Sequence, residues 1–183
     1  MGLDLVEFIM ATEVAFGVDI ADSDAERIVA PRHLIAYLRA RLPAAEDTPC
    51  LTQQAFYRVR DSVAAQSNLP RAALRPSTAL EAALPGLTRR DAWRAWGRTL
   101  GAGAWPSLPG TGWLGRRLAL GTPSLGAATR HLVIWGPAAV KRGAGWTDRE
   151  IEACVVALIE ADLGVDMSRH TLDAGFVDDL RVD

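Results

Sequence analysis

Several features that mark other protein classes are missing from this sequence of 183 residues. It holds two cysteines, Cys50 and Cys154, and three histidines without finger-like spacing, so we expect neither a disulfide framework nor a metal site. We interpret both cysteines as packing residues. No run reaches the roughly 18 apolar residues of a membrane span, and acids stand where a signal peptide carries lysines. These absences predict a cytoplasmic protein.

The motifs of common catalytic chemistry are also missing. The sequence has no glycine-rich phosphate loop after a strand, no His-Glu-x-x-His and no serine in a nucleophile elbow. We interpret His33, His131 and His170 as ordinary helix or loop residues. The pair Asp178 and Asp179 is more typical of a solvated or capping role than of acid–base catalysis. We therefore expect no enzyme activity.

Charge is unevenly distributed along the chain. Residues 1–46 carry eight acids and four arginines, a formal charge of −4. Residues 47–146 carry four acids, twelve arginines and one lysine, which gives +9, and residues 147–183 carry ten acids and three arginines, which gives −7. The two acidic ends resemble each other more than they resemble the basic middle. The charge pattern therefore divides the chain into two acidic ends and a basic middle.

Helical periodicity dominates both acidic ends. The first end predicts helices at about 3–16, 23–28 and 31–42, with Gly17 ending the first and Pro31 opening the last. Apolar residues of the first helix recur near every 3.6 positions, and we expect this stripe to face the core: Leu3, Val6, Ile9, Met10 and Val14.

The other acidic end begins with a capping box, in which Thr147 is followed three residues later by Glu150. It predicts a helix at 147–163. The rest, 165–183, reads as an acidic loop held by apolar side chains rather than as a strand.

The basic middle predicts a further set of helices. Their ranges are about 52–67, 88–100 and 125–135, with an irregular segment at 101–126, an amphipathic turn at 113–120 and a linker at 136–145. The sequence therefore predicts an all-α protein.

The two ends form a recognisable pattern when the C-terminal residues are placed directly before the N-terminal ones. Residues 171–183 read T-L-D-A-G-F-V-D-D-L-R-V-D, and residues 2–10 read G-L-D-L-V-E-F-I-M. This resembles the acyl carrier protein family, whose loop T-L-x-x-x-F-V-E-D-L-G-x-D precedes S-L-D-x-V-E-L-x-M. Glu13, Phe16 and Ile20 match the end of the family's next helix. The resemblance covers about 80 residues in circularly permuted order. It implies that residues 1–46 plus 147–183 form one four-helix bundle and that residues 47–146 are a second domain inserted into it.

The middle resembles a second, degenerate carrier fold in normal order. That resemblance is carried by the segment 76–80 and by Thr88 at the start of its second helix.

The family attaches phosphopantetheine to a serine at the start of the second helix, where free N–H groups favour a phosphate. Here Gly2 takes that position, next to Asp183 in the permuted order, and glycine has no hydroxyl. The resemblance therefore implies a carrier without its prosthetic group, and we expect no cofactor. The equivalent residue of the middle is Thr88, which lacks the family's acidic flanks.

These features lead to the hypothesis of a non-catalytic, carrier-like protein that acts as a binding scaffold or as a decoy. Its partners would be proteins, among them enzymes that recognise acyl carriers. The expected recognition residues lie on the first helix: Leu3, Asp4, Glu7, Met10 and Glu13.

Two other functions remain open. One is a genuine acyl or peptidyl carrier loaded at another hydroxyl, with Thr88 as the candidate. The other is a peripheral membrane protein with an exposed patch of Trp105, Trp113, Arg116 and Arg117, although a core role is favoured for these tryptophans. The arginines of the middle are scattered without a recognition motif, so no nucleic-acid partner is expected.

For assembly, we expect a monomer whose bundle closes within one chain, with a helix-exchanged dimer as the alternative. We also expect removal of residues 147–183 to uncover Leu3, Val6 and Met10 and to cause aggregation.

Overall fold

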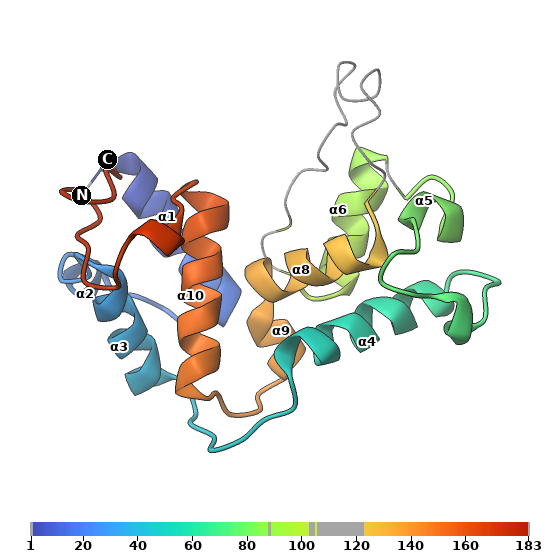
Figure 1. Cartoon of the computed structure of the whole chain (residues 1–183), viewed down its shortest axis with the longest axis horizontal. Helices are drawn as coiled ribbons and strands as arrows, with labels where there is room; N and C mark the ends of the chain where they lie inside the picture. The colour runs from blue at the N-terminus through green and yellow to red at the C-terminus, as the bar shows by residue number, and fades with distance from the viewer. Residues whose placement is uncertain (1, 88, 103–104, 106–122, 183) are drawn as a thin grey trace. The chain divides into compact units, whose positions relative to one another are not determined.

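The computed structural model describes residues 2–87, 89–102, 105 and 123–182, and over these residues the fold is all-helical, as predicted (Figure 1). Within them the only β pairing consists of two isolated bridges. The chain divides into two compact units. Unit 1 comprises Met1–Thr48 and Lys141–Asp183, and unit 2 comprises Pro49–Val140.

Unit 1 combines helices from both ends of the chain. Its elements are α1 (Leu3–Phe16), α2 (Asp22–Ala25), α3 (Pro31–Arg41), α10 (Asp148–Asp162) and the 3-10 turn η2 (Met167–Arg169). The predicted first helix is confirmed at both ends, and the predicted helices at 31–42 and 147–163 are confirmed to within one residue. Helix α10 packs against α3 and α1, so elements far apart in sequence share one core.

Local sequence signals explain where these helices begin and end. Gly17 adopts a left-handed conformation with φ 66°, and its N–H donates to the Glu13 carbonyl at 2.8 Å, which ends α1. Pro31 occupies the first turn of α3, where its missing N–H costs no hydrogen bond. At α10 the capping box is complete: Thr147 Oγ1 accepts from the Glu150 N–H, and the Glu150 carboxylate accepts from the Thr147 N–H.

The core of unit 1 is aromatic and aliphatic. The rings of Phe8 and Phe176 lie 5.6 Å apart, and those of Phe16 and Trp146 lie 5.3 Å apart. The core also contains fully buried aliphatic side chains from α3 and α10: Leu34, Leu38, Val155, Leu158 and Ile159.

The expected inward stripe of α1 is wrong for four of its five residues. Ile9 is buried, but Leu3, Val6, Met10 and Val14 are exposed. The buried face instead consists of Leu5, Phe8, Ile9, Thr12, Ala15 and Phe16. Both stripes have helical spacing because α1 is apolar around most of its circumference, so periodicity alone could not choose between them. The face that carries two phenylalanines packs inward.

The loop after α10 is held to unit 1 by backbone and apolar contacts, as expected. The Phe176 N–H donates to the Val29 carbonyl at 3.0 Å, and the Arg32 N–H donates to the Leu172 carbonyl at 2.9 Å. Phe176, Leu180 and Val182 are buried. The end of this loop is therefore fixed beside the helices of the first 41 residues.

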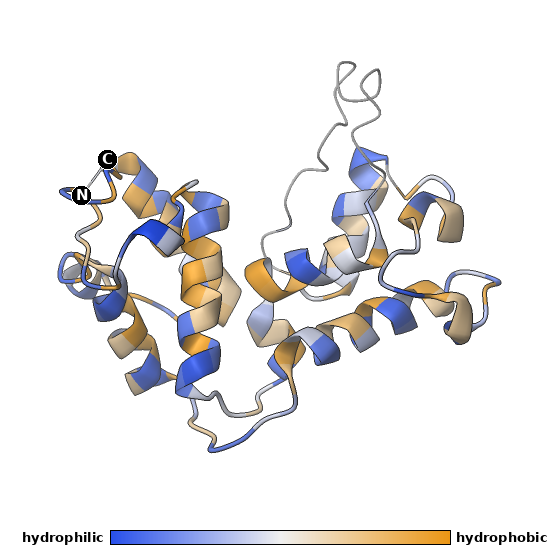
Figure 2. Ribbon diagram, in the orientation of Figure 1, coloured by the Kyte–Doolittle hydropathy of each residue, from blue (hydrophilic) through white to orange (hydrophobic). Residues whose placement is uncertain are grey.

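Unit 2 is also helical. Its elements are α4 (Leu51–Ala64), η1 (Arg71–Ala73), α5 (Leu80–Ala83), α6 (Arg90–Thr99), α8 (Leu125–Trp135) and α9 (Pro137–Lys141), whose last residue already belongs to unit 1. Helix α4 packs along α8. Figure 2 shows that α6 combines strongly hydrophilic residues with residues of intermediate hydropathy. The predicted turn at 113–120 lies outside the described residues.

The expected linker at 136–145 is wrong in its first half, which forms α9. Proline at the first helical position and alanines after it favour a helix, and Gly136 before it had suggested a loop. Directly after the linker, the Trp146 N–H donates to the Pro43 carbonyl at 2.7 Å and the Ala45 N–H donates to the Trp146 carbonyl at 2.9 Å. The chain therefore leaves and re-enters unit 1 at paired positions.

Over the part of the chain that is described, no helix is long and apolar enough to cross a bilayer.

Candidate functional site

Helix α1 presents the residues that the sequence singled out for recognition. Leu3, Asp4, Glu7 and Met10 are exposed, so their side chains are accessible on unit 1. Glu13 is half-buried, and its Oε1 accepts from the Ile20 N–H at 2.7 Å. Glu13 therefore holds the turn that follows α1, a structural role that its spacing did not reveal.

Gly2 is the N-cap of α1. Its backbone is extended, with φ −74° and ψ 172°, and no side chain caps the helix. The backbone carbonyl of Gly2 accepts from the Val6 N–H at 3.2 Å. A glycine here leaves the start of α1 without a hydroxyl that could accept a phosphoryl group, and Asp4 places a negative charge in the first turn.

A pocket of about 220 Å³ lies next to this helix start. It brings together three segments of unit 1 that are distant in sequence: Asp4 and Glu7 of α1, Asp162 and Leu163 at the end of α10, and Leu180, Arg181 and Val182. The segment that follows α10 therefore reaches the start of α1. Asp183, which the sequence pattern places beside Gly2, lies outside the described residues.

The electrostatics of this pocket disfavour a bound anion. Burial raises the pKa of Asp162, and the neighbouring carboxylate of Glu7 raises it further. Three carboxylates and one guanidinium, that of Arg181, line the pocket. A phosphate placed there would meet more negative than positive charge, so the pocket does not resemble a phosphate site.

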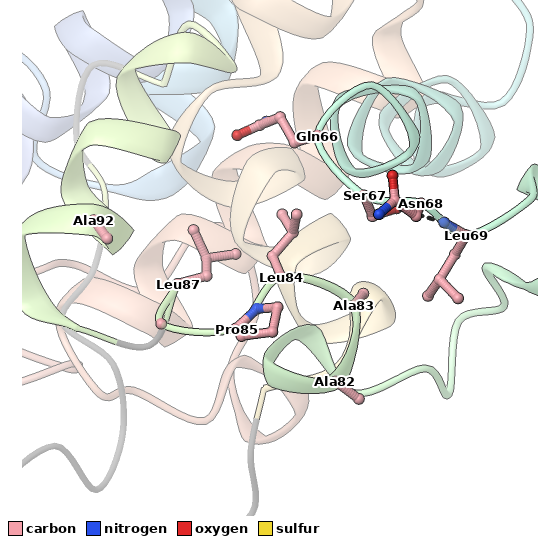
Figure 3. Close-up of a pocket in the computed structure, with 11 residues that line it drawn as sticks. Gln66, Ser67, Asn68, Leu69, Ala82, Ala83, Leu84, Pro85, Leu87 and Ala92 are labelled. Carbon is pink, nitrogen blue, oxygen red and sulfur yellow. Dashed lines mark hydrogen bonds between the residues drawn. The ribbon is translucent and has the colours of Figure 1, made fainter.

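The second candidate attachment residue, Thr88, lies outside the described residues. Arg89 is the N-cap of α6 and provides no side-chain cap, whereas the sequence predicted a helix start at Thr88. A pocket of about 550 Å³ lies beside Leu87 and has no charged side chain in its lining (Figure 3). The lining residues come from three segments: Gln66 to Leu69, Ala82 to Leu87, and Ala92. The pocket has room for an apolar group but no charge that would hold a phosphate.

The tryptophan and arginine stretch is only partly described. Trp105 is half-buried, and its ring lies 5.2 Å from that of Trp93 and 6.1 Å from that of Trp96. It therefore packs in the aromatic core of unit 2. The other members of the predicted patch, Trp113, Arg116 and Arg117, lie outside the described residues.

This aromatic core includes a histidine whose packing the sequence did not predict. The ring of His131 lies 6.2 Å from that of Trp93 and 6.0 Å from that of Trp105. Burial lowers the pKa of His131, and the positive charge of Arg130 lowers it further. Both effects favour the neutral imidazole of His131. Gly97 makes the packing possible, because a Cβ there would overlap the indole of Trp105.

A buried ion pair is a second feature that the sequence did not reveal. Lys141, the only lysine of the chain, has a 1% exposed side chain, and its Nζ lies 3.0 and 2.9 Å from the two carboxylate oxygens of Glu150. Thr48 Oγ1 donates to Glu150 Oε1 at 2.7 Å. Burial opposes ionisation of Glu150, but hydrogen bonds from Thr147, Thr48 and Lys141 outweigh it and lower the pKa. This cluster binds Thr48 and Lys141, the residues at which the chain leaves and re-enters unit 1, to Glu150 of α10.

The two cysteines differ. Cys154 is buried in α10, and burial raises the pKa of its thiol to about 12, so it acts as an apolar packing residue. Cys50 is exposed before α4, which contradicts the expectation that it packs in a core. Among the described residues, no group of three or more histidine, cysteine or acidic side chains is arranged to hold a metal ion.

Comparison with known proteins finds a similarity that covers part of the chain. The chain is similar to Acyl carrier protein 2 of Pseudomonas aeruginosa strain PAO1, with 54% identity over 41 residues. These residues make up 22% of this chain and 52% of the relative, so the chain spans about half the length of the curated protein that it matches. No family model and no solved structure matches the chain. The chain therefore contains a region similar to an acyl carrier protein, within a fold whose described residues are all-helical.

Proposed function

We propose that this chain is a non-catalytic, acyl-carrier-like protein that binds other proteins through α1 and carries no phosphopantetheine arm. The observation that carries the proposal is Gly2 at the N-cap of α1. The sequence resemblance aligns this position with the family's attachment serine. The similarity to an acyl carrier protein supports the carrier-like character. The acidic and apolar side chains that α1 exposes support a role in protein binding.

We also propose that unit 1 is a carrier bundle in circularly permuted order and that unit 2 is inserted into it. Two observations support this arrangement. Helix α10 packs against α3 and α1, and Leu180 to Val182 share a pocket with Asp4 and Glu7. The segment after α10 thus reaches the start of α1, as it would if the two were consecutive.

The missing arm is tested by incubating the full chain with a phosphopantetheinyl transferase and coenzyme A and measuring its intact mass. We expect no gain, and a true carrier in the same reaction serves as the positive control. A gain of one phosphopantetheine would refute the proposal. If that gain disappeared in Thr88→Ala, the alternative of a carrier loaded on unit 2 would replace it.

The binding role is tested by calorimetry with an enzyme that recognises acyl carriers. Glu7→Arg should weaken binding about tenfold, because it places a positive charge at the centre of the exposed face of α1. Glu26→Arg makes the same change in net charge at an exposed position outside α1 and is the matched control. Equal losses in both variants would indicate general charge attraction rather than recognition of α1.

A further inference from the structure

Helix α6 of unit 2 has a row of exposed arginines. Arg90, Arg94 and Arg98 recur every four residues, so they lie along one side of the helix about 6 Å apart in rise. All three are exposed, whereas Trp93 and Trp96 on the same helix are buried. None of the three arginines forms an ion pair within the described residues. We call these three residues the arginine row.

The charge of the chain is divided between the two units. Counted from the sequence, unit 1 holds 19 acids and nine bases, a formal charge of −10. Unit 2 holds 11 arginines and three acids, a formal charge of +8. Every copy of the chain therefore carries a strongly acidic and a strongly basic surface.

The start of α1 is an acidic surface whose exposed carboxylates form no ion pairs within the described residues. Asp4 and Glu7 are both exposed, and neither forms an ion pair within the described part of the chain. Asp162 adds a third carboxylate to the same pocket, and Glu7 is close enough to raise its pKa. Leu3, Val6 and Met10 lie on the same helix and are exposed. This surface therefore combines carboxylates that form no ion pairs with exposed apolar side chains.

We propose that the arginine row of one copy binds the acidic start of α1 on a second copy, in a weak head-to-tail association. The guanidinium groups would neutralise Asp4 and Glu7, and the aliphatic stems of the arginines would cover exposed apolar side chains of α1. The two surfaces differ, so an associated pair of copies leaves one surface of each kind free, the acidic one on the first copy and the arginine row on the second. Such heterologous contacts extend into short open chains or close into rings.

A second copy fits the arginine row better than a nucleic acid does. A nucleic acid is negative along its whole length, whereas a second copy offers an acidic unit of −10 to unit 2 and a basic unit of +8 to unit 1, so it can pair with both units. The association does not depend on the function proposed above, since it requires only the two charged surfaces.

The test measures the average mass of the full chain against concentration by sedimentation equilibrium. At about 0.02 M salt we expect the mass to rise with concentration, and at about 0.5 M salt, where charges are screened within a few ångströms, we expect a monomer. Arg94→Glu or Glu7→Arg alone should weaken the association at least tenfold. An equimolar mixture of the two variants should associate again, because each retains the surface that the other has lost.

Arg75→Glu is the matched control, since Arg75 is exposed in unit 2 but lies outside α6. It should retain the association. Circular dichroism verifies that each variant is folded, and the mixture provides a gain that misfolding cannot produce. The proposal is overturned by a monomer at every concentration, by association that salt does not weaken, or by equal losses in Arg75→Glu and Arg94→Glu. It is also overturned if salt changes the hydrodynamic radius without changing the mass, which would indicate a contact within one chain.

Discussion

Gly97 shows how one missing side chain organises the core of unit 2. The helix position faces Trp105, and the absence of a Cβ lets the indole lie directly against the backbone of α6. Glycine inside a helix costs about 1 kcal/mol relative to alanine, so the packing of Trp105 must return more than that. Glycine at this position therefore serves the contact with Trp105 rather than backbone freedom.

We predict that Gly97→Ala destabilises unit 2 although alanine is the better helix former. The new methyl group would displace Trp105, and overpacking of this kind costs about 1 to 3 kcal/mol. The measurement is urea unfolding followed by tryptophan fluorescence. Ala95→Ser, at an exposed position of the same helix, should change stability by about 0.5 kcal/mol or less. A Gly97→Ala variant more stable than the wild type would contradict the packing of Trp105.

Glu150 should make the stability of unit 1 depend on pH. Its pKa is lowered in the folded protein, so the folded state binds fewer protons in acid than the unfolded state does. The resulting stabilisation is fully present above about pH 5 and is lost as pH falls below the usual glutamate range near about 4. We predict that Glu150→Gln flattens the decrease in unfolding free energy over that interval.

Unfolding by urea at a series of pH values provides the measurement for Glu150→Gln. Glu152→Gln, an exposed neighbour on α10, should leave the decrease unchanged. Parallel curves for the wild type and Glu150→Gln would show that the buried pair with Lys141 does not set the acid sensitivity.

Two helices, one in each unit, have side-chain caps that can be compared directly. Thr147 Oγ1 accepts from the Glu150 N–H at the start of α10, and Ser124 Oγ accepts from the Ala127 N–H at the start of α8, both at 3.2 Å. We predict that Thr147→Ala and Ser124→Ala each cost about 1 kcal/mol. Hydrogen exchange should speed up in α10 for the first variant and in α8 for the second. Faster exchange in both helices from either variant would show that the two units unfold together.

The positions of the helices were the feature that the sequence predicted best. Which face of a helix is buried was predicted least well. Gly17, Pro31 and the Thr147 capping box are local signals, and they located α1, α3 and α10 because helix ends depend on nearby atoms. The buried face of α1 depends on the shape of the core, where Phe8 meets Phe176, and no local pattern contains that contact.

The site was predictable in part for a related reason. The residues of α1 were identified from a pattern of sequence letters, and four of them are exposed. The roles of Glu13 and Lys141 depend on hydrogen bonds to residues 7 and 9 positions away, across turns whose geometry the sequence did not define. The Gly97 and Trp105 contact was missed because a glycine inside a helix usually signals a weak helix rather than a binding partner.

At the scale of the whole molecule, unit 1 is assembled from two separated pieces. We predict that a reordered chain, residues 141–183 followed directly by 2–48, folds cooperatively without unit 2. All core contacts between α1, α3 and α10 are retained in that order. Circular dichroism and thermal unfolding provide the measurement. A reordered chain without a cooperative transition would contradict the permuted bundle.

Residues 1–48 alone are the control for the reordered chain, and they should not fold stably. Short helices are marginal in water without tertiary packing, and α10 supplies the missing half of the core. The expected result of removing residues 147–183 changes accordingly. Leu3, Val6 and Met10 are exposed already, so the surface uncovered by the truncation is that of Leu5 and Phe8.

The order of the helices also determines how long after α1 its packing partner α10 is synthesised. Helices α1 to α3 leave the ribosome first, but α10 follows α3 only after 106 intervening residues, 42–147. At about 5 to 20 residues per second, the apolar face of α1 waits on the order of 5 to 20 s for its partner. Unit 2 is complete before α10 appears and can fold first, so the earlier half of unit 1 remains a client for chaperones during that interval.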